Sequence, residues 1–78
     1  MKIEPIYHKL GKLIAERRVE VDMTHTDLAI KIHLSRSSVV NIEAGRQRIS
    51  LHNLLKTEKA LGYPFGYLIA KVCRDDHR

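Results

Sequence analysis

Apolar residues recur at helical spacing in five successive segments of this chain. The first segment runs from about Pro5, a residue suited to the first turn of a helix, to about Val21. Its inward stripe consists of Ile6, Leu10, Leu13, Ile14 and Val21. The opposite side is charged, so the pattern predicts an amphipathic helix that covers one side of a core.

Two short helices with a tight turn between them are predicted next. Thr24 and Asp27 form a capping-box-like pair at the start of the first helix, which ends near His33. Ser35 is the expected N-cap of the second helix, and Gly45 suits the left-handed residue at its end. The inward positions are Leu28, Ala29 and Ile32 in the first helix and Val39 and Ile42 in the second.

The last two segments predict two further helices. Ser50 is the expected N-cap of the fourth helix, and Gly62 ends it. Tyr63-Pro64 then opens a final short helix that continues to Val72. The fourth helix has an apolar face formed by Leu51, Leu54, Leu55 and Leu61, and the final helix carries Phe65, Leu68, Ile69 and Val72.

A chain of 78 residues has room for one domain with one modest core. We expect a compact, all-α domain of five helices over residues 1–72, followed by a short polar tail over residues 73–78. Apolar residues make up 44% of the chain and charged residues 29%, with a mean hydropathy of −0.28, as in a folded globular domain. No apolar run approaches the roughly 20 residues of a membrane-spanning helix, and no secretory segment is recognisable, so a cytoplasmic protein is expected.

The net charge of +5 is concentrated in one part of the chain. Residues 31–57 carry five cationic side chains and one acidic side chain, which gives this stretch a net charge of +4. These side chains are Lys31, Arg36, Arg46, Arg48 and Lys56, with Glu43 as the acidic one. Such clustering suits a polyanionic partner, because lysine and arginine release counterions when they bind phosphates. Taken alone, the charge is explained equally well by an ordinary solvated surface.

The two short helices define a candidate functional unit. Two such helices joined by a tight turn in a small basic domain form the unit that places its second helix in the major groove of DNA. Leu34 in the turn and the apolar residues of both helices point to one internal seam. The side chain of Ala29 is small enough for the helices to cross closely. The pattern therefore predicts a helix-turn-helix over about residues 24–45 that binds double-stranded DNA.

The segment from Met23 to Gly45 closely resembles the phage repressor and Cro family, also called the XRE family. The matching residues are Leu28-Ala29, Ser35-Arg36-Ser37-Ser38-Val39, Ile42-Glu43-x-Gly45 and Ala60-Leu61-Gly62 at the end of the fourth helix. Extended by Leu10 to Arg18 and by Leu51 to Leu55, the resemblance covers most of residues 8–69. It implies a lambda-repressor-like fold and a DNA-binding regulator.

The resemblance assigns base contacts to the start of the third helix. In the family, residues just after the N-cap and one about a turn later reach base edges, which implies Arg36, Ser37 and Asn41 here. Val40 is placed to touch a thymine methyl group. The chemistry agrees, because arginine pairs bidentately with guanine and asparagine with adenine. The alternative for Arg36 is a solvated surface arginine.

The resemblance also implies phosphate contacts on both sides of that helix. These come from Ser38, from Arg46, Gln47 and Arg48 beyond the helix, and from backbone N–H groups near His25. The family commonly has glutamine where this chain has His25, so a phosphate contact there would depend partly on pH. A plain exposed histidine is an equally good interpretation.

A further implication concerns how the third helix is oriented. In the family, an arginine late in the first helix pairs with the glutamate that ends the recognition helix, and these positions are Arg18 and Glu43 here. We expect this structural brace to be partly buried. Removing one partner of a buried pair costs about 3 to 5 kcal/mol, whereas an exposed pair contributes ~0 to 1 kcal/mol.

The last helix carries more apolar surface than so short a helix needs. Phe65, Tyr67, Leu68, Ile69 and Val72 form this surplus, which we interpret first as a homodimer interface. A twofold dimer would bring two recognition helices to half-sites about 34 Å apart. Two alternatives stay open, namely simple closure of the core and an interface with another protein such as a toxin.

Other functions have weak support in the sequence. The scattered histidines have no partnered spacing, so no enzyme is predicted. They are His8, His25, His33, His52 and His77. Cys73 and His77 form only half of a metal pair, so no metal or other cofactor is expected. RNA binding is a weaker third choice, because the few aromatic residues offer no platform for stacking unpaired bases.

The sequence therefore predicts a homodimeric transcriptional regulator, a repressor or autoregulator, that binds a short inverted repeat in the cytoplasm and associates with the nucleoid through DNA. The alternative is an antitoxin or partner-binding module that masks another protein, with DNA binding secondary. Small size relates the chain equally to restriction-modification controllers, phage Cro-type regulators and small antitoxins.

Overall fold

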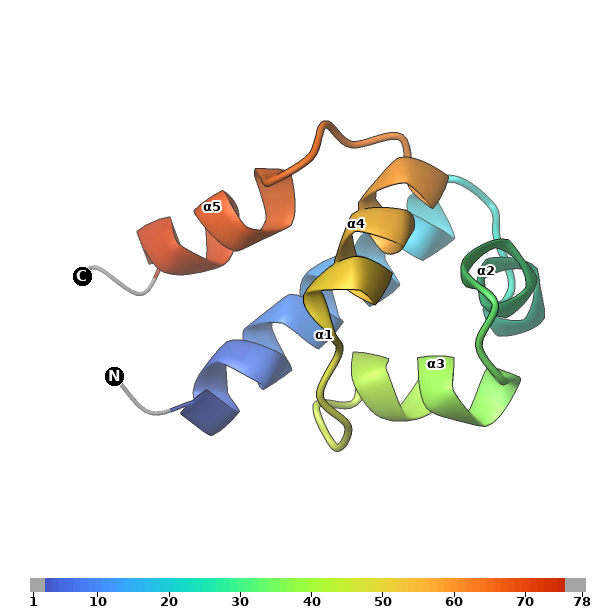
Figure 1. The fold of residues 1–78 in the computed structure, drawn as a ribbon, viewed down its shortest axis with the longest axis horizontal. Helices are drawn as coiled ribbons and strands as arrows, with labels where there is room; N and C mark the ends of the chain where they lie inside the picture. The colour runs from blue at the N-terminus through green and yellow to red at the C-terminus, as the bar shows by residue number, and fades with distance from the viewer. Residues whose placement is uncertain (1–2, 76–78) are drawn as a thin grey trace.

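Five helices make up the part of the chain that the structure, a computed structural model, describes, which is residues 3–75. They are α1 (Ile3–Glu20), α2 (His25–Ile32), α3 (Arg36–Glu43), α4 (Leu51–Ala60) and α5 (Tyr67–Asp75). No strand occurs within that range, so the predicted all-α fold class is confirmed. Figure 1 shows α2 at one end of the molecule, α5 at the other end and α3 along the lower edge. None of the described helices is both long and apolar enough to cross a membrane.

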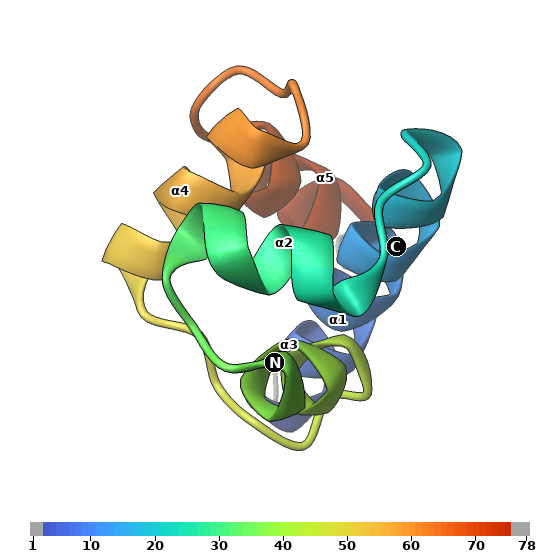
Figure 2. The ribbon, with the colours of Figure 1, turned by 90° about the vertical axis from the view of Figure 1, so that its right-hand side faces the viewer.

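One apolar cluster holds the five helices together. Its buried members are Leu10, Ile14, Leu28, Ala29, Ile32, Val39, Ile42, Leu54, Leu61, Leu68 and Val72. Packing contacts join α1 to α3 and α5, and join α2 to α3 and α4. Figure 2 shows α2 crossing in front of α1, with α3 below it and α4 beside it. Burial of each Leu, Ile or Val side chain stabilises the fold by roughly 1.5 to 3 kcal/mol, so this cluster fixes where α3 lies.

The inward positions predicted from the pattern are mostly buried, with one error in α4. Leu54 and Leu61 lie in the core as predicted, and Leu55 is half-buried. Leu51, which we expected to face inward, has 63% of its surface exposed. It is the first residue of α4, and it lies at the rim of a surface groove beyond the core. The apolar spacing therefore includes the first turn of α4, but the buried part of the helix begins only at Leu54.

The start of α2 has the capping box that the sequence predicts. The Thr24 hydroxyl accepts a hydrogen bond from the Asp27 backbone N–H at 3.0 Å, and the Asp27 carboxylate accepts one from the Thr24 N–H at 3.0 Å. The hydrogen bond from the Thr24 backbone is the main reason that the pKa of Asp27 lies below its ordinary value. At the other end of α2, His33 adopts a left-handed conformation with φ of 59°, which turns the chain toward α3.

The start of α5 differs from the prediction. We expected this helix to open at Tyr63-Pro64, but it begins at Tyr67, and Phe65 lies in the connection before it. The buried carboxylate of Glu58 accepts hydrogen bonds from the backbone N–H groups of Gly66 at 2.9 Å and Leu68 at 2.8 Å. This side chain of α4 therefore sets the start of α5, a contact that local periodicity cannot show.

The end of α5 lies beyond the predicted boundary at Val72. The helix continues to Asp75, so the first part of the predicted polar tail is helical. The rest of that tail, residues 76–78, lies outside the described residues.

Candidate nucleic-acid interface

The outward side of α3 carries four side chains that we call the reading edge: Arg36, Ser37, Val40 and Asn41. Arg36 and Ser37 are exposed, and Val40 and Asn41 are half-buried. Residues three and four apart share one side of a helix, and the buried residues of α3 occupy the opposite side. The four predicted base-contacting residues therefore share one surface, which offers a guanidinium, a hydroxyl, an amide and a small apolar group.

The first turn of α3 is capped as predicted. The Ser35 hydroxyl accepts a hydrogen bond from the Ser38 backbone N–H at 3.0 Å. It also donates to the Ser38 hydroxyl at 3.1 Å. The side chain of Arg36, the first residue of the helix, makes no hydrogen bond or ion pair with another described residue. Its guanidinium therefore has all of its donors available for an external acceptor.

Asn41 connects the reading edge to the loop after α3. Its backbone carbonyl accepts hydrogen bonds from the backbone N–H groups of Arg46 at 2.9 Å and Gln47 at 3.2 Å. Its side-chain oxygen accepts a further one from Arg46 Nε at 3.1 Å. The amide oxygen has a second lone pair and the amide nitrogen has two N–H groups, so Asn41 can pair bidentately with adenine while Arg46 holds it in place.

The residues predicted to contact phosphates lie near both ends of α3. Arg46 and Arg48 are exposed beyond its C-terminal end, and Gln47 between them is half-buried. The guanidinium of Arg48 lies over the Tyr7 ring, 5.8 Å from its centroid, which links this loop to α1. Ser38 is half-buried in the first turn.

An ion pair joins α1 to the last residue of α3. Arg18 Nε lies 2.7 Å from Glu43 Oε2, and Arg18 Nη2 lies 3.2 Å from Glu43 Oε1. Arg18 also donates through Nη1 to the backbone carbonyl of Met23 at 2.8 Å. The two charged side chains are only 11% and 7% exposed. The predicted partners are thus in bidentate contact at a largely buried site.

His25 contributes a contact that the sequence did not reveal. Its Nε2 lies 3.0 Å from Glu43 Oε1 and 3.2 Å from Arg18 Nη2, so its ring faces the ion pair. A phosphate contact near His25 is thereby left to the backbone N–H groups at the start of α2. No local signal in the sequence points to this contact, because it depends on how α2 packs against α1 and α3.

Gly11 lets α3 approach α1 closely. A Cβ atom at this position would overlap the carbonyl oxygen of Ile42 and would lie 2.6 Å from that of Glu43. No larger residue fits unless α3 moves. Gly11 was not singled out from the sequence, although glycine inside a helix costs roughly 0.5 to 1 kcal/mol relative to alanine and so points to a packing requirement.

The residues predicted to form a dimer interface fall into two groups. Leu68 and Val72 are 0% and 3% exposed and belong to the core, so they have no surface left for a partner. Phe65, Tyr67 and Ile69 are 69%, 36% and 41% exposed. Closure of the core, one of the alternatives, thus accounts for part of the apolar surplus.

An aromatic stack lies where α4 leads into α5. The rings of Tyr63 and Tyr67 stack with centroids 4.3 Å apart, and the guanidinium of Arg17 lies 4.9 Å from the centroid of Tyr63. Partial burial raises the pKa of the Tyr63 hydroxyl above its ordinary value. The stack fixes the first turn of α5 against α1.

Cys73 and His77, considered above as half of a metal site, gain no further ligand among the described residues. Cys73 is exposed on α5, and His77 lies outside the described range. Within residues 3–75, no three His, Cys, Asp or Glu side chains gather as metal ligands would.

Comparison with known proteins adds independent information about this arrangement. A family model described as Helix-turn-helix matches residues 14–68, from the middle of α1 into α5. The chain belongs to the helix-turn-helix family. The matched part includes the ion pair, all of α3 and the loop after it, so the resemblance inferred from the sequence motifs is confirmed.

Individual relatives of this helix-turn-helix chain are regulators. A transcriptional regulator in the ATPase CF(0) region of Rhodospirillum rubrum is 32% identical over 69 residues, which is 88% of this chain and 64% of the relative. The chain thus spans less than two thirds of that relative's length. The restriction-modification controller protein C.AhdI from Aeromonas hydrophila is 33% identical, with a TM-score of 0.72 over 74% of this chain and 88% of its own. The controller protein C.Esp1396I, in a mutant form bound to its highest-affinity operator site, shares the fold with a TM-score of 0.78, 23% identity, 94% coverage of this chain and 96% of its own.

Proposed function

We propose that this helix-turn-helix chain is a DNA-binding transcriptional regulator whose α3 enters the major groove. The observation that carries the proposal is a short capped helix with a free polar side. That helix is held at its other side by the core, by the contact at Gly11 and by the Arg18–Glu43 pair. Reading base edges requires such a fixed position, because a bidentate contact tolerates little displacement. The regulators among the relatives support the same conclusion.

Recognition in this proposal divides between base contacts and phosphate contacts. Arg36 pairs with guanine, Asn41 with adenine, Ser37 bonds either, and Val40 meets a thymine methyl group. The phosphates are held by groups that set the position of α3 and carry no sequence information. These groups are Ser38, Arg46, Gln47, Arg48 and the backbone N–H groups near His25.

The proposal includes a homodimer on an inverted repeat. The exposed Ile69 borders an apolar groove of about 370 Å³, which is also lined by Ile6, Tyr7, Ile49 and Leu51. Exposed apolar surface of this kind typically marks an interface. The longest dimension of the chain is 34 Å, close to the spacing of about 34 Å between half-sites on one side of a duplex. Two copies that meet through the groove would therefore fit adjacent half-sites.

A second candidate function is an antitoxin or partner-binding module. Phe65 favours it, because this large apolar side chain is 69% exposed in the connection between α4 and α5. In this alternative, Phe65, Tyr67 and Ile69 mask another protein such as a toxin, and DNA binding is secondary.

The regulator proposed here acts in the cytoplasm, is held at the nucleoid by its operator, and is a repressor or autoregulator. It carries out no catalysis and needs no cofactor.

Selection of bound sites from random duplex DNA tests the proposal. A regulator of this kind is expected to enrich one inverted repeat with half-sites about one helical turn apart, roughly 10 base pairs. Absence of any enriched sequence would contradict DNA reading and favour the partner-binding alternative.

A further inference from the structure

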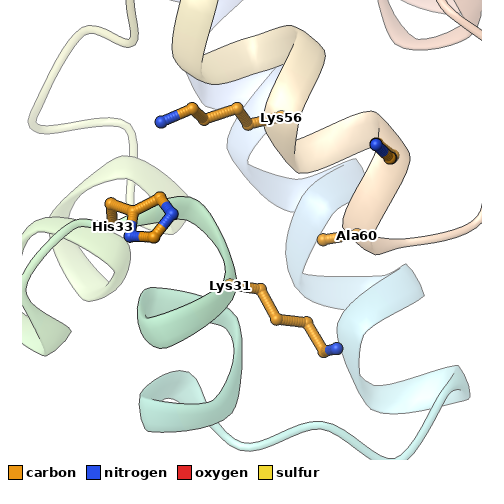
Figure 3. A pocket seen from close by; sticks show the side chains of 5 residues that line it. Lys31, His33, Lys56 and Ala60 are labelled. Atoms are coloured by element: carbon orange, nitrogen blue, oxygen red, sulfur yellow. The ribbon is translucent and has the colours of Figure 1, made fainter.

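A basic groove lies between the C-terminal part of α2 and the facing side of α4, outside the reading edge. The groove has a volume of about 400 Å³ and is lined by Lys31, His33, Lys56, Lys59 and Ala60 (Figure 3). We call it the flank groove. Figure 3 shows Lys31 on one side, Lys56 on the other and His33 near its end.

Most of the positive charge of the flank groove is not compensated by described neighbours. The side-chain ammonium groups of Lys31, Lys56 and Lys59 form no hydrogen bond or ion pair within residues 3–75. Asp27 lies one turn before Lys31 and interacts with its charge, while its carboxylate also accepts a hydrogen bond from the Thr24 backbone N–H. Glu58 lies between the two lysines of α4 in sequence, yet its buried carboxylate faces the start of α5. The groove therefore presents a surplus of positive charge to the solvent.

Helix ends explain only part of this charge. Lys31 and Lys59 lie in the last turns of α2 and α4, where cations interact favourably with the helix dipole. Lys56 lies before the last turn of its helix, and its side chain extends toward the side of the groove where His33 lies (Figure 3). Helix stability alone does not account for bringing these residues around one space.

The position of the flank groove relates it to DNA beyond the reading edge. His33 immediately precedes the turn that leads to α3. Figures 1 and 2 place α2 at the end of the molecule opposite α5. If two copies meet on the side of α5, the α2 end of each copy faces away from the twofold axis. In Figures 1 and 2 the C-terminal part of α4 lies farther from α3 than its N-terminal part does, so a duplex that continues past a half-site reaches the groove by bending toward the α2 end.

We propose that the flank groove binds the sugar-phosphate backbone of duplex DNA outside the operator half-site. The inference rests on the proposed DNA-binding function and extends its footprint. Lysine binds phosphate as a point charge, and a phosphate contact carries no sequence information, which suits a contact outside the recognised sequence. The groove is open rather than enclosed, and a duplex carries one negative charge per about 1.7 Å of its axis, so each cation meets a phosphate. The free-energy cost of bending the flanking duplex toward the protein is offset by these contacts.

Two duplexes test the proposal with the full chain. Both contain the same selected site, but one ends at the edges of the site and the other extends about two helical turns, roughly 21 base pairs, on each side. The test variant carries Lys56→Gln and Lys59→Gln. The control carries Lys12→Gln and Lys71→Gln, which remove the same charge from one exposed lysine on α1 and one half-buried lysine on α5.

The expected result is selective for duplex length. Wild type and control bind the long duplex more tightly than the short one, and the test variant loses this advantage while binding the short duplex as the wild type does. Its salt slope on the long duplex falls by about 0.9 for each phosphate that the variant no longer neutralises. An unchanged advantage and slope in the test variant would overturn the inference alone and favour an acidic protein segment as the occupant. Failure of the wild type to bind either duplex would overturn the proposed function, and the inference with it.

Discussion

Single residues decide how firmly α3 is held and what it can bind. Arg18 and Glu43 illustrate what the sequence can reveal, because family motifs pointed to both partners and the structure brings them into contact. The ring of His25 on the same carboxylate was missed, since its position depends on how α2 packs against α1 and α3. The hydrogen bond from Arg46 to Asn41 was missed for the same kind of reason, because it depends on the path of a loop. The pair that belongs to a family motif was thus predictable, whereas the contacts of His25 and Arg46 required the fold.

Loss of the Glu43 charge is expected to destabilise the protein strongly. Glu43→Gln leaves the guanidinium of Arg18 largely buried without a compensating anion, so the free energy of unfolding should fall by up to about 3 to 5 kcal/mol. Urea denaturation measures this loss of stability. Glu20→Gln is the matched control, because Glu20 pairs with Arg17 at 3.4 Å on the surface. Loss of this exposed pair should lower the free energy of unfolding by at most about 1 kcal/mol. Equal small losses in both variants would show that the Arg18–Glu43 pair is not an important brace.

Helix ends were predicted correctly where the capping residues are close to each other in the sequence. The capping box of α2 and the N-cap of α3 were predicted because each involves residues at most three positions apart. The start of α5 was predicted wrongly because a carboxylate eight residues away on α4 determines it. A sequence-based clue lay in the pattern itself, since Glu58 occupies a charged position on the apolar side that includes Leu54 and Leu61.

The close contact between α1 and α3 predicts whether a Gly11→Ala variant is more or less stable than the wild type. The answer depends on whether helix propensity or overpacking dominates. Gly11→Ala should increase helix propensity in α1 by up to about 1 kcal/mol, yet its Cβ would overlap the backbone at the end of α3. Because backbone carbonyls cannot yield as a flexible side chain can, overpacking should dominate and cost about 1 to 3 kcal/mol. Thermal unfolding and affinity for a selected site should both fall. The exposed neighbouring variant Lys12→Ala should leave both unchanged, and a more stable Gly11→Ala protein would refute the close contact.

At the scale of the whole molecule, the surface separates into a reading edge, an apolar groove and a basic flank groove. Charge counting along the sequence located a basic region but did not separate Arg36 and Arg46, near α3, from Lys31 and Lys56, which line the flank groove. Apolar counting likewise did not separate Leu68, which closes the core, from Ile69, which is exposed. These distinctions depend on which way a side chain points after the helices have packed.

The exposed apolar groove predicts how the oligomer can be disrupted. Ile69→Lys places a charge in the proposed dimer interface without touching the core, so the variant should remain folded but become monomeric. Sedimentation equilibrium measures this change. Ile30→Lys is the matched control, because Ile30 is 68% exposed on α2 at the other end of the molecule and should leave the dimer intact. A dimeric Ile69→Lys variant would exclude this side of α5 as the interface.

The central claim, that α3 reads DNA through its outward side, is tested most directly by Arg36→Ala. Bound sites are selected from random duplex DNA by the wild type, by this variant and by Arg74→Ala, an exposed arginine on α5 that serves as the control. We expect the wild type and the control to select the same inverted repeat. The Arg36→Ala protein should lose its preference at one base pair in each half-site, with a cost of about 1 to 3 kcal/mol. If Arg36→Ala selects the same motif as the wild type, the claim that α3 reads DNA through its reading edge is contradicted.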